Sequence, residues 1–223
     1  MSAYLLIDIW IIIGPLLLSL NPRFRFDHHL KPLLFSIAVV GAIFIAWDSL
    51  VTWRGDWSFN TGFVYPIRCL NLPLEELLFF MVVPFSCLFL YRGLQKYLPP
   101  KPISYPTTYN YLLALFFIGL AWIWQARVYT ALVMLAVGLL FILQATYFKK
   151  TFEQLSYWIW LGMVTGLFLI FNYYLTAGPI VIYNPEAILN LRLLTIPIED
   201  LFYNYLLLTL YLDFYLLAKN NFL

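Results

Sequence analysis

Seven apolar runs, separated by Pro, Asn, Gly and charged residues, divide this chain of 223 residues. They lie near residues 3–20, 32–53, 73–97, 107–126, 128–148, 154–177 and 195–218. A helix needs about 20 apolar residues to cross a bilayer, and these runs approach or exceed that length. Charged residues make up only 11% of the chain and hydrophobic residues 63%. The sequence therefore predicts an all-α membrane protein, a bundle of about seven transmembrane helices.

The composition also argues against several kinds of site. The formal net charge is only +2, and no basic stripe of the kind that binds nucleic acid is present. The two cysteines, Cys69 and Cys87, form no CxxC or Cys/His cluster. We therefore expect no nucleic-acid partner, no metal site and no disulfide framework.

Two acidic stretches of the chain match each other. "LNLPLEELLFF" begins at residue 70 and "LTIPIEDLFYN" at residue 194, an offset of 124 residues (194 − 70 = 124). A fixed register between polar residues indicates an internal duplication, whereas leucine matches in so apolar a chain carry no weight. The pairs at this offset include Asp48 with Asn172, Arg68 with Arg192, Pro73 with Pro197, Glu75 with Glu199, Glu76 with Asp200 and Phe79 with Tyr203.

The duplication divides the predicted helices into two sets of three joined by one. We expect a first repeat over residues 1–98, a connector helix within 99–126, and a second repeat over 127–223. A single connecting helix leaves both halves in the same orientation, as a parallel repeat about an axis along the membrane normal. Both acidic stretches are therefore predicted to lie at the same end of the bundle.

Basic residues are distributed unevenly between the two ends of the predicted bundle. One end has only Arg54, Arg68, Arg127 and Arg192. Cytoplasmic loops carry an excess of Lys and Arg, so the pattern predicts an external N-terminus and an internal C-terminus, in a bacterial cytoplasmic membrane. The other end has Arg23, Arg25, Lys31, Arg92, Lys96, Lys101, Lys149, Lys150 and Lys219.

The acids of the two stretches have two interpretations. Pro73 and Pro197 fit the first turn of a helix, and carboxylates in that turn stabilise the positive end of the helix dipole. Capping needs one acid rather than two adjacent ones, however, and acids in membrane helices usually face the bundle interior. Arg68 and Arg192 each precede the first acid by seven residues (75 − 68 = 7), so they are candidate ion-pair partners.

Aromatic rings follow the acids at helical spacing. Phe79 and Tyr203 each lie one turn beyond the first acid of their stretch. Aromatic faces stabilise cations, and a carboxylic acid in a dry cavity can donate a proton, so this arrangement suits carbocation chemistry on an alkene. Ordinary packing would also explain the rings. The candidate catalytic acids are Glu75, Glu76, Glu199 and Asp200, and the polar residues expected to line the interior are Asp48, Asn172 and Asn204.

The stretches "LPLEELLFF" and "IPIEDLFYN", together with "IAWDSL" at 45–50, resemble a known family. They are similar to the membrane-integral lycopene cyclases, which are heterodimeric in some actinobacteria and form a domain of fungal fusions with phytoene synthase. Here both halves lie in one chain. The second motif departs from the first by Asp at position 200, so the two acid pairs need not be equivalent.

The resemblance implies an activity and roles for individual residues. It implies a cofactor-independent cyclisation of the ψ-end groups of lycopene to β-ionone rings. Glu75 or Glu199 would then protonate the terminal double bond, and a carboxylate would remove a proton after ring closure. Lycopene and the lipid bilayer are the implied partners, with other carotenoid-pathway enzymes as further candidates. The aromatic residues implied to hold the cation are Phe79, Tyr203, Trp47 and Trp53.

Two alternative functions remain open on the sequence. A carotenoid hydratase would use the same cation but capture it with water. A SWEET-type sugar carrier has the same arrangement of three helices, a connector and three helices. Its hinge prolines are not matched here, because Pro15 has Leu139 at the corresponding position.

Overall fold

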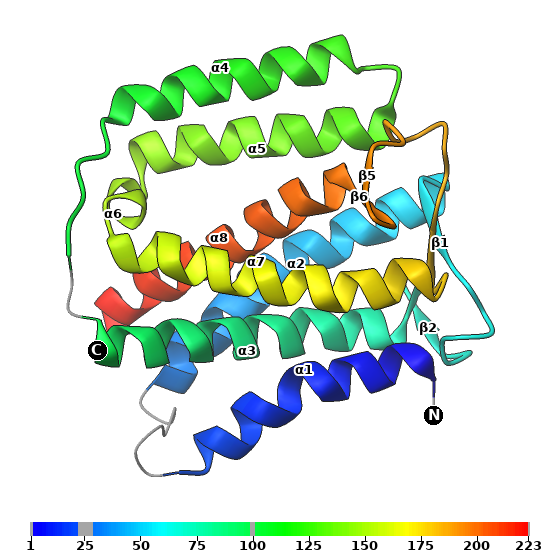
Figure 1. Cartoon of the computed structure of the whole chain (residues 1–223), viewed down its shortest axis with the longest axis horizontal. Helices are drawn as coiled ribbons and strands as arrows, with labels where there is room; N and C mark the ends of the chain where they lie inside the picture. The colour runs from blue at the N-terminus through cyan, green and yellow to red at the C-terminus, as the bar shows by residue number, and fades with distance from the viewer. Residues whose placement is uncertain (1, 22–28, 99–100, 223) are drawn as a thin grey trace.

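The computed structural model describes residues 2–21, 29–98 and 101–222 (Figure 1). Each of the seven predicted helices is present, with bounds that differ from the predicted ones by a few residues. The only helix of the described residues that the sequence analysis missed is the short α6. The helices are α1 (Ala3–Ser19), α2 (Leu30–Arg54), α3 (Leu74–Tyr97), α4 (Thr107–Ile123), α5 (Val128–Thr146), α6 (Lys149–Phe152), α7 (Leu155–Ala177) and α8 (Ile198–Phe222).

Length and composition make most of these helices membrane spans. Five of them (α2, α3, α5, α7 and α8) are long and apolar enough to cross a bilayer, while α1 and α4 are apolar but have 17 residues each. The prediction of a helical membrane bundle is therefore confirmed. Its orientation stays a prediction, and two of the residues on which it rests, Arg23 and Arg25, lie outside the described residues.

The outer faces of the bundle are apolar. Trp10 on α1 is 70% exposed, and Leu115 and Trp122 on α4 are 71% and 74% exposed. In a soluble protein such side chains would be buried, whereas in a bilayer they contact acyl chains that are as apolar as they are. The exposed apolar surface is thus the face that lipid covers.

The helices pack mainly in pairs. In Figure 1, α4 lies beside α5 at one edge of the molecule and α1 beside α3 at the other, while α2 packs against α8 between these edges. Both α3 and α8 begin at the end of the bundle that carries the strands. The two acidic stretches therefore open their helices at the same end, as the sequence predicts.

Three two-stranded sheets close this end of the bundle, and the sequence analysis did not predict them. The strand β1 (Trp57–Phe59) pairs antiparallel with β4 (Val181–Tyr183), which links the two halves of the chain. The other sheets are short hairpins that lead directly into the acidic helices. They are formed by β2 (Arg68–Cys69) with β3 (Leu72–Pro73), and by β5 (Arg192–Leu193) with β6 (Ile196–Pro197).

The hairpin turns explain why they escaped the sequence analysis. Leu70 and Asn71 both have positive φ (53° and 66°), as in a type I′ turn, and Leu194 in the second hairpin has φ 58°. These turns usually carry Gly or Asn, and a leucine at positive φ is uncommon. Asn71 is the only usual turn residue among these three positions, so the sequence signal for the turns is weak.

The loops before α3 and α8 make the same hydrogen bonds at positions 124 residues apart. Asn60 N donates to Ile180 O over 2.9 Å, and Asn184 N donates to Asp56 O over 2.8 Å (184 − 60 = 124; 180 − 56 = 124). Each loop is therefore tied to the other through equivalent atoms. The offset of 124 residues that relates matching side chains therefore also relates these two hydrogen bonds. The division into repeats at residues 98 and 126 stays a prediction.

Candidate active site

Residues from both halves of the chain meet around one small cavity at the strand-bearing end of the bundle. Its volume is about 60 Å³, and we call it the acid chamber. Its lining includes the second acid of each motif and three tyrosines, so both motifs contribute to the same site. The described residues that line it are Tyr4, Asp48, Trp57, Phe59, Glu76, Phe79, Phe168, Asn172, Leu175, Val181, Tyr183, Asp200 and Tyr203.

Helix ends bring the acids of the chamber together. Glu76 and Asp200 lie in the first turns of α3 and α8, where the helix dipole favours a negative charge. Asp48 comes from the last two turns of α2, and Asn172 occupies the equivalent place in α7. All four side chains are buried, so the chamber is a polar site enclosed by an apolar bundle.

Asp48 and Glu76 form a carboxyl pair. The two side chains share a hydrogen bond. Tyr4 donates its hydroxyl to Glu76 Oε2 over 2.6 Å, and Tyr203 donates its hydroxyl to Asp48 Oδ1 over 2.8 Å. An ionised carboxylate can only accept hydrogen bonds, so two carboxyl groups bond to each other only when one carries a proton. Such a pair can hold one proton between its two carboxyl groups, away from water.

Asp200 has a different environment on the opposite wall of the chamber. Its Oδ2 accepts hydrogen bonds from Asn172 Nδ2 over 2.9 Å and from the Tyr183 hydroxyl over 2.7 Å. Tyr183 lies in β4, and burial first, then the charge of Asp200, raises the pKa of its hydroxyl well above the usual value. Tyr183 therefore remains a proton-bearing donor, and its hydroxyl and the Asn172 amide both favour the ionised form of Asp200 over the protonated one.

The first acid of each motif points elsewhere. Glu75 Oε1 accepts from Tyr65 N over 2.8 Å and from the Ser2 hydroxyl, and Glu199 Oε1 accepts from Leu189 N over 2.8 Å and also from a threonine hydroxyl on α5. Both are fully buried, and neither lines the chamber. Each one fastens its own loop to the bundle, which is the structural role that the capping interpretation anticipated in part.

This fastening role gives a stability prediction. Glu75→Ala leaves the Ser2 hydroxyl and the Tyr65 amide without their acceptor, and each such loss costs about 1–3 kcal/mol. Glu75→Gln keeps the acceptor oxygen and should be much milder. We expect a clear drop in thermal unfolding temperature in detergent for the alanine variant alone. Glu186→Ala is the matched control, because the Glu186 side chain is 87% exposed. Equal stability of Glu75→Ala and Glu186→Ala would contradict the role.

Aromatic rings surround the chamber. The Tyr203 ring lies 5.3 Å from Phe44, 6.2 Å from Trp57 and 6.3 Å from Trp47, measured between ring centroids, and each of these contacts is edge-to-face. Phe79 and Tyr203 line the chamber as expected, while Trp47 packs behind Tyr203 without lining it. Ring faces and edges thus border the space in which a cation would form.

Three of the candidate residues do not line the chamber. Trp53 is 74% exposed on the outer face of α2, so it cannot hold a cation in the chamber. Arg68 and Arg192 are exposed at the hairpins and donate to the backbone oxygens of Asn71 and Thr195. Neither makes a salt bridge with Glu75 or Glu199 among the described residues. The Arg192 guanidinium instead lies 5.9 Å from the centroid of the Tyr183 ring, and its charge acts on Asp200 from outside the chamber.

Other residues of the site escaped the sequence analysis. Tyr4, Trp57 and Tyr183 line the chamber, and only Tyr183 had a usable signal, because it replaces Phe59 at the 124-residue offset (183 − 59 = 124). Asp8 on α1 is also buried, its carboxyl interacts electrostatically with Glu76, and neither of its oxygens has a hydrogen-bond partner among the described residues. A single tyrosine or aspartate in an apolar helix carries no pattern by itself.

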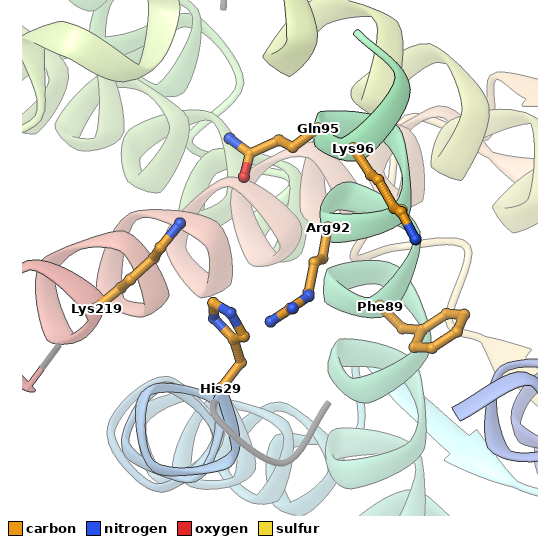
Figure 2. Close-up of a pocket in the computed structure, with 7 residues that line it drawn as sticks. His29, Phe89, Arg92, Gln95, Lys96 and Lys219 are labelled. Atoms are coloured by element: carbon orange, nitrogen blue, oxygen red, sulfur yellow. The ribbon is translucent and has the colours of Figure 1, made fainter. Parts of the chain in front are cut away.

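A larger cavity lies at the opposite end of the bundle. It has a volume of about 410 Å³, and its described lining includes His29 at the start of α2, Arg92 and Lys96 near the end of α3, and Lys219 near the end of α8. In Figure 2, Arg92 and His29 point toward one another, while Lys96 points away from them. The described lining of this cavity has four basic side chains and no carboxylate.

The chain was compared with known proteins. The family model described as lycopene cyclase matches residues 1–94 and 126–218, which leaves out the stretch that contains α4. No curated protein and no solved structure matches the chain. Because the two matched segments cover most of the sequence and contain all the acids and rings that line the chamber, this protein belongs to the lycopene cyclase family.

Proposed function

We propose that this chain converts the ψ-end groups of lycopene to β-ionone rings by acid catalysis without a cofactor. The observation that carries the proposal is that a candidate proton donor and a candidate proton acceptor lie in the same dry chamber. A carboxyl pair that can share a proton, Asp48 with Glu76, lies in the same chamber as Asp200, whose ionised form is favoured by two hydrogen-bond donors. An acid and a base at separate positions are what a cyclisation by proton addition and proton loss requires.

The first step is proton transfer from the Asp48–Glu76 pair to the terminal double bond of the end group. The proton adds to the CH carbon, and the dimethyl carbon becomes a tertiary cation. The next double bond of the chain attacks that cation, which closes a six-membered ring and moves the positive charge to the methyl-bearing ring carbon. Aromatic faces near the charge stabilise it, and Trp57, Phe79 and Tyr203 are positioned to do so.

The last step is proton loss. Asp200 removes the proton from the ring carbon that joins the polyene, and the electrons of that bond form the ring double bond of a β-ionone ring. One proton enters and one leaves, so the reaction needs no oxidant or reductant. Asp200 and Glu76 line the same small chamber, so the proton has only to return across it to the carboxyl pair to restore the starting state.

Expression in a host that accumulates lycopene tests the proposal directly. Pigment extraction and chromatography should show carotenoids with β-rings in cells that carry the intact chain, and none in cells that carry the empty vector. A hydroxylated acyclic carotenoid would instead identify a hydratase, because water would have captured the same cation. Unchanged lycopene from a well-expressed protein would refute both activities.

The shared chamber makes a prediction about the order of products. Both motifs build one site, so the two ends of lycopene should be cyclised in separate binding events. A monocyclic carotenoid should appear first and decline as the bicyclic product rises, with a lag in the bicyclic product. The check is a time course with purified protein in liposomes, with lycopene at limiting amounts. Bicyclic product without a lag, and without free monocyclic carotenoid, would contradict the sequential order.

A further inference from the structure

Two further cavities connect the acid chamber with the surface of the bundle through shared lining residues. An inner cavity of about 260 Å³ lies between α1, α3, α7 and α8. It shares lining residues with the chamber, namely Phe79, Phe168, Asn172 and Leu175. An outer groove of about 560 Å³ lies between α1 and α7 and shares Trp10 and Phe171 with the inner cavity. The three spaces therefore follow one another from the surface of the bundle to the acids.

The outer groove opens where lipid covers the protein. Among its lining residues, Trp10 is 70% exposed, Tyr174 59% and Ile170 55%. These are large apolar or amphipathic side chains on membrane helices, so the groove faces acyl chains rather than water. A molecule dissolved in the bilayer can reach it without crossing an aqueous phase.

The walls of the inner cavity indicate the chemistry of its occupant. Most of the described lining is apolar, and the Ser86 hydroxyl is already used, because it donates to Ile11 O over 3.1 Å. Asn204 is 5% exposed and lines the cavity, and its Nδ2 has no hydrogen-bond partner among the described residues. An amide N–H can donate weakly to a π system, which a conjugated polyene offers and a saturated acyl chain does not.

We propose that the outer groove and the inner cavity hold the polyene arm of the carotenoid, which enters from the bilayer between α1 and α7 and delivers its end group to the acid chamber. This inference rests on the proposed cyclase function and adds the path and the occupant. The spaces follow one another from the lipid-facing surface to the acids, which fits a linear hydrocarbon with a reactive end. Asn204, on this view, is a binding residue that lies against the conjugated chain rather than a catalytic one.

Gly14 provides a way to close the path. It lines the inner cavity, and a Cβ added there would meet no heavy atom within 4 Å. A side chain can therefore start from Gly14 without a clash at its Cβ, and the ring of Gly14→Phe should occupy part of the cavity. Gly119 on α4 is the matched control, because its Cβ would also meet nothing within 4 Å and it is not among the described lining residues of these cavities. We expect Gly14→Phe to lower the cyclisation rate at least tenfold and Gly119→Phe to leave it nearly unchanged.

Cys87 gives a readout of binding that does not depend on catalysis. It lines the inner cavity and is 9% exposed, whereas the other cysteine, Cys69, is exposed at a hairpin and can be replaced by serine. In a Cys69→Ser, Glu76→Gln protein in liposomes, lycopene should slow the reaction of Cys87 with a lipophilic maleimide about tenfold. Lycopane, the saturated hydrocarbon of the same skeleton, should protect less, and adding Gly14→Phe should remove protection by lycopene.

The outcomes separate the path from the reaction. Protection of Cys87 by lycopene, lost on Gly14→Phe, supports the path even if the intact chain forms no ring, in which case only the proposed function fails. Cyclisation by the intact chain with no protection of Cys87 overturns the path and leaves the function standing. Full activity of a stably folded Gly14→Phe protein would also overturn the path. Equal protection by lycopane would overturn the assignment of a conjugated occupant.

Discussion

Glu76→Gln is expected to lower the rate of lycopene cyclisation by a factor of about 10² to 10⁴, the usual contribution of a positioned general acid. The substitution keeps the size of the side chain and its ability to accept from the Tyr4 hydroxyl. It removes the proton that Glu76 shares with Asp48, and with it the source of the initial protonation. The measurement is the initial rate of ring formation by purified protein in liposomes, with the amount of folded protein determined separately.

The neighbouring acid is the control for this experiment. Glu75→Gln makes the same chemical change one residue earlier, at a side chain that lies outside the chamber and retains its acceptor oxygen. We expect it to keep most of the activity. Asp48→Asn should resemble Glu76→Gln, and the double substitution should cost little more than either one, because the two groups act as a unit. The reverse ranking, with Glu75→Gln inactive and Glu76→Gln active, would mean that Glu75, the first acid of the motif, is the proton donor.

Asp200→Asn is expected to have the second large effect, again about 10² to 10⁴ in rate. An asparagine can still accept hydrogen bonds from Asn172 and Tyr183, so the wall of the chamber should keep its shape. The base that removes the last proton is lost, however, so the ring cation must lose a proton from another carbon or react with water. The product analysis should therefore change as well as the rate, toward other positions of the ring double bond or toward hydroxylated rings.

A second aspartate on the same helix provides the control. Asp213 on α8 is buried and accepts hydrogen bonds from Gln144 and from Thr151, the latter over 2.6 Å, but it does not line the chamber. Asp213→Asn repeats the loss of a buried carboxylate without touching the site. We expect unchanged products at a rate within about a factor of a few, as for substitutions distant from a site. If Asp200→Asn behaved like Asp213→Asn, the base would have to be assigned to another group.

The family match decides between the functions that the sequence left open. A sugar carrier and a cyclase can both arrange three helices, a connector and three helices, so the number of helices could not separate them. The match over residues 1–94 and 126–218 includes both acidic stretches and the helices they begin. Hydration stays an alternative that only product analysis can separate from cyclisation, because both reactions begin with the same proton transfer and the same cation.

The lengths of the apolar runs in the sequence were enough to predict the helical bundle. Apolar runs of membrane-spanning length define the helices, because a lipid environment requires every backbone group to be satisfied within its own segment. The 124-residue offset also predicts that Glu76 and Asp200 lie at the same end of the bundle. It did not reveal the hairpins, whose turns use Leu70 and Leu194 at positive φ in place of glycine.

The division of work within each acid pair could not be read from the sequence. Adjacent residues on a helix point in directions about 100° apart, so only one acid of each pair can face a given cavity. Which one does so depends on where α3 and α8 meet their neighbours. The sequence favoured Glu75 and Glu199 as proton donors, whereas the structure turns these toward the loop amides of Tyr65 and Leu189.

By itself, the sequence determined the membrane bundle, the paired acidic motifs and their common end, because those depend on hydrophobicity and on matched residues along the chain. Only the tertiary structure decided that the two motifs build one chamber, that Glu76 and Asp200 face it, and that Trp53 faces away from it. The physical reason is that hydrophobicity fixes which segments are helical but not how each helix is rotated. That rotation follows from the contacts between segments far apart in the sequence, such as β1 with β4.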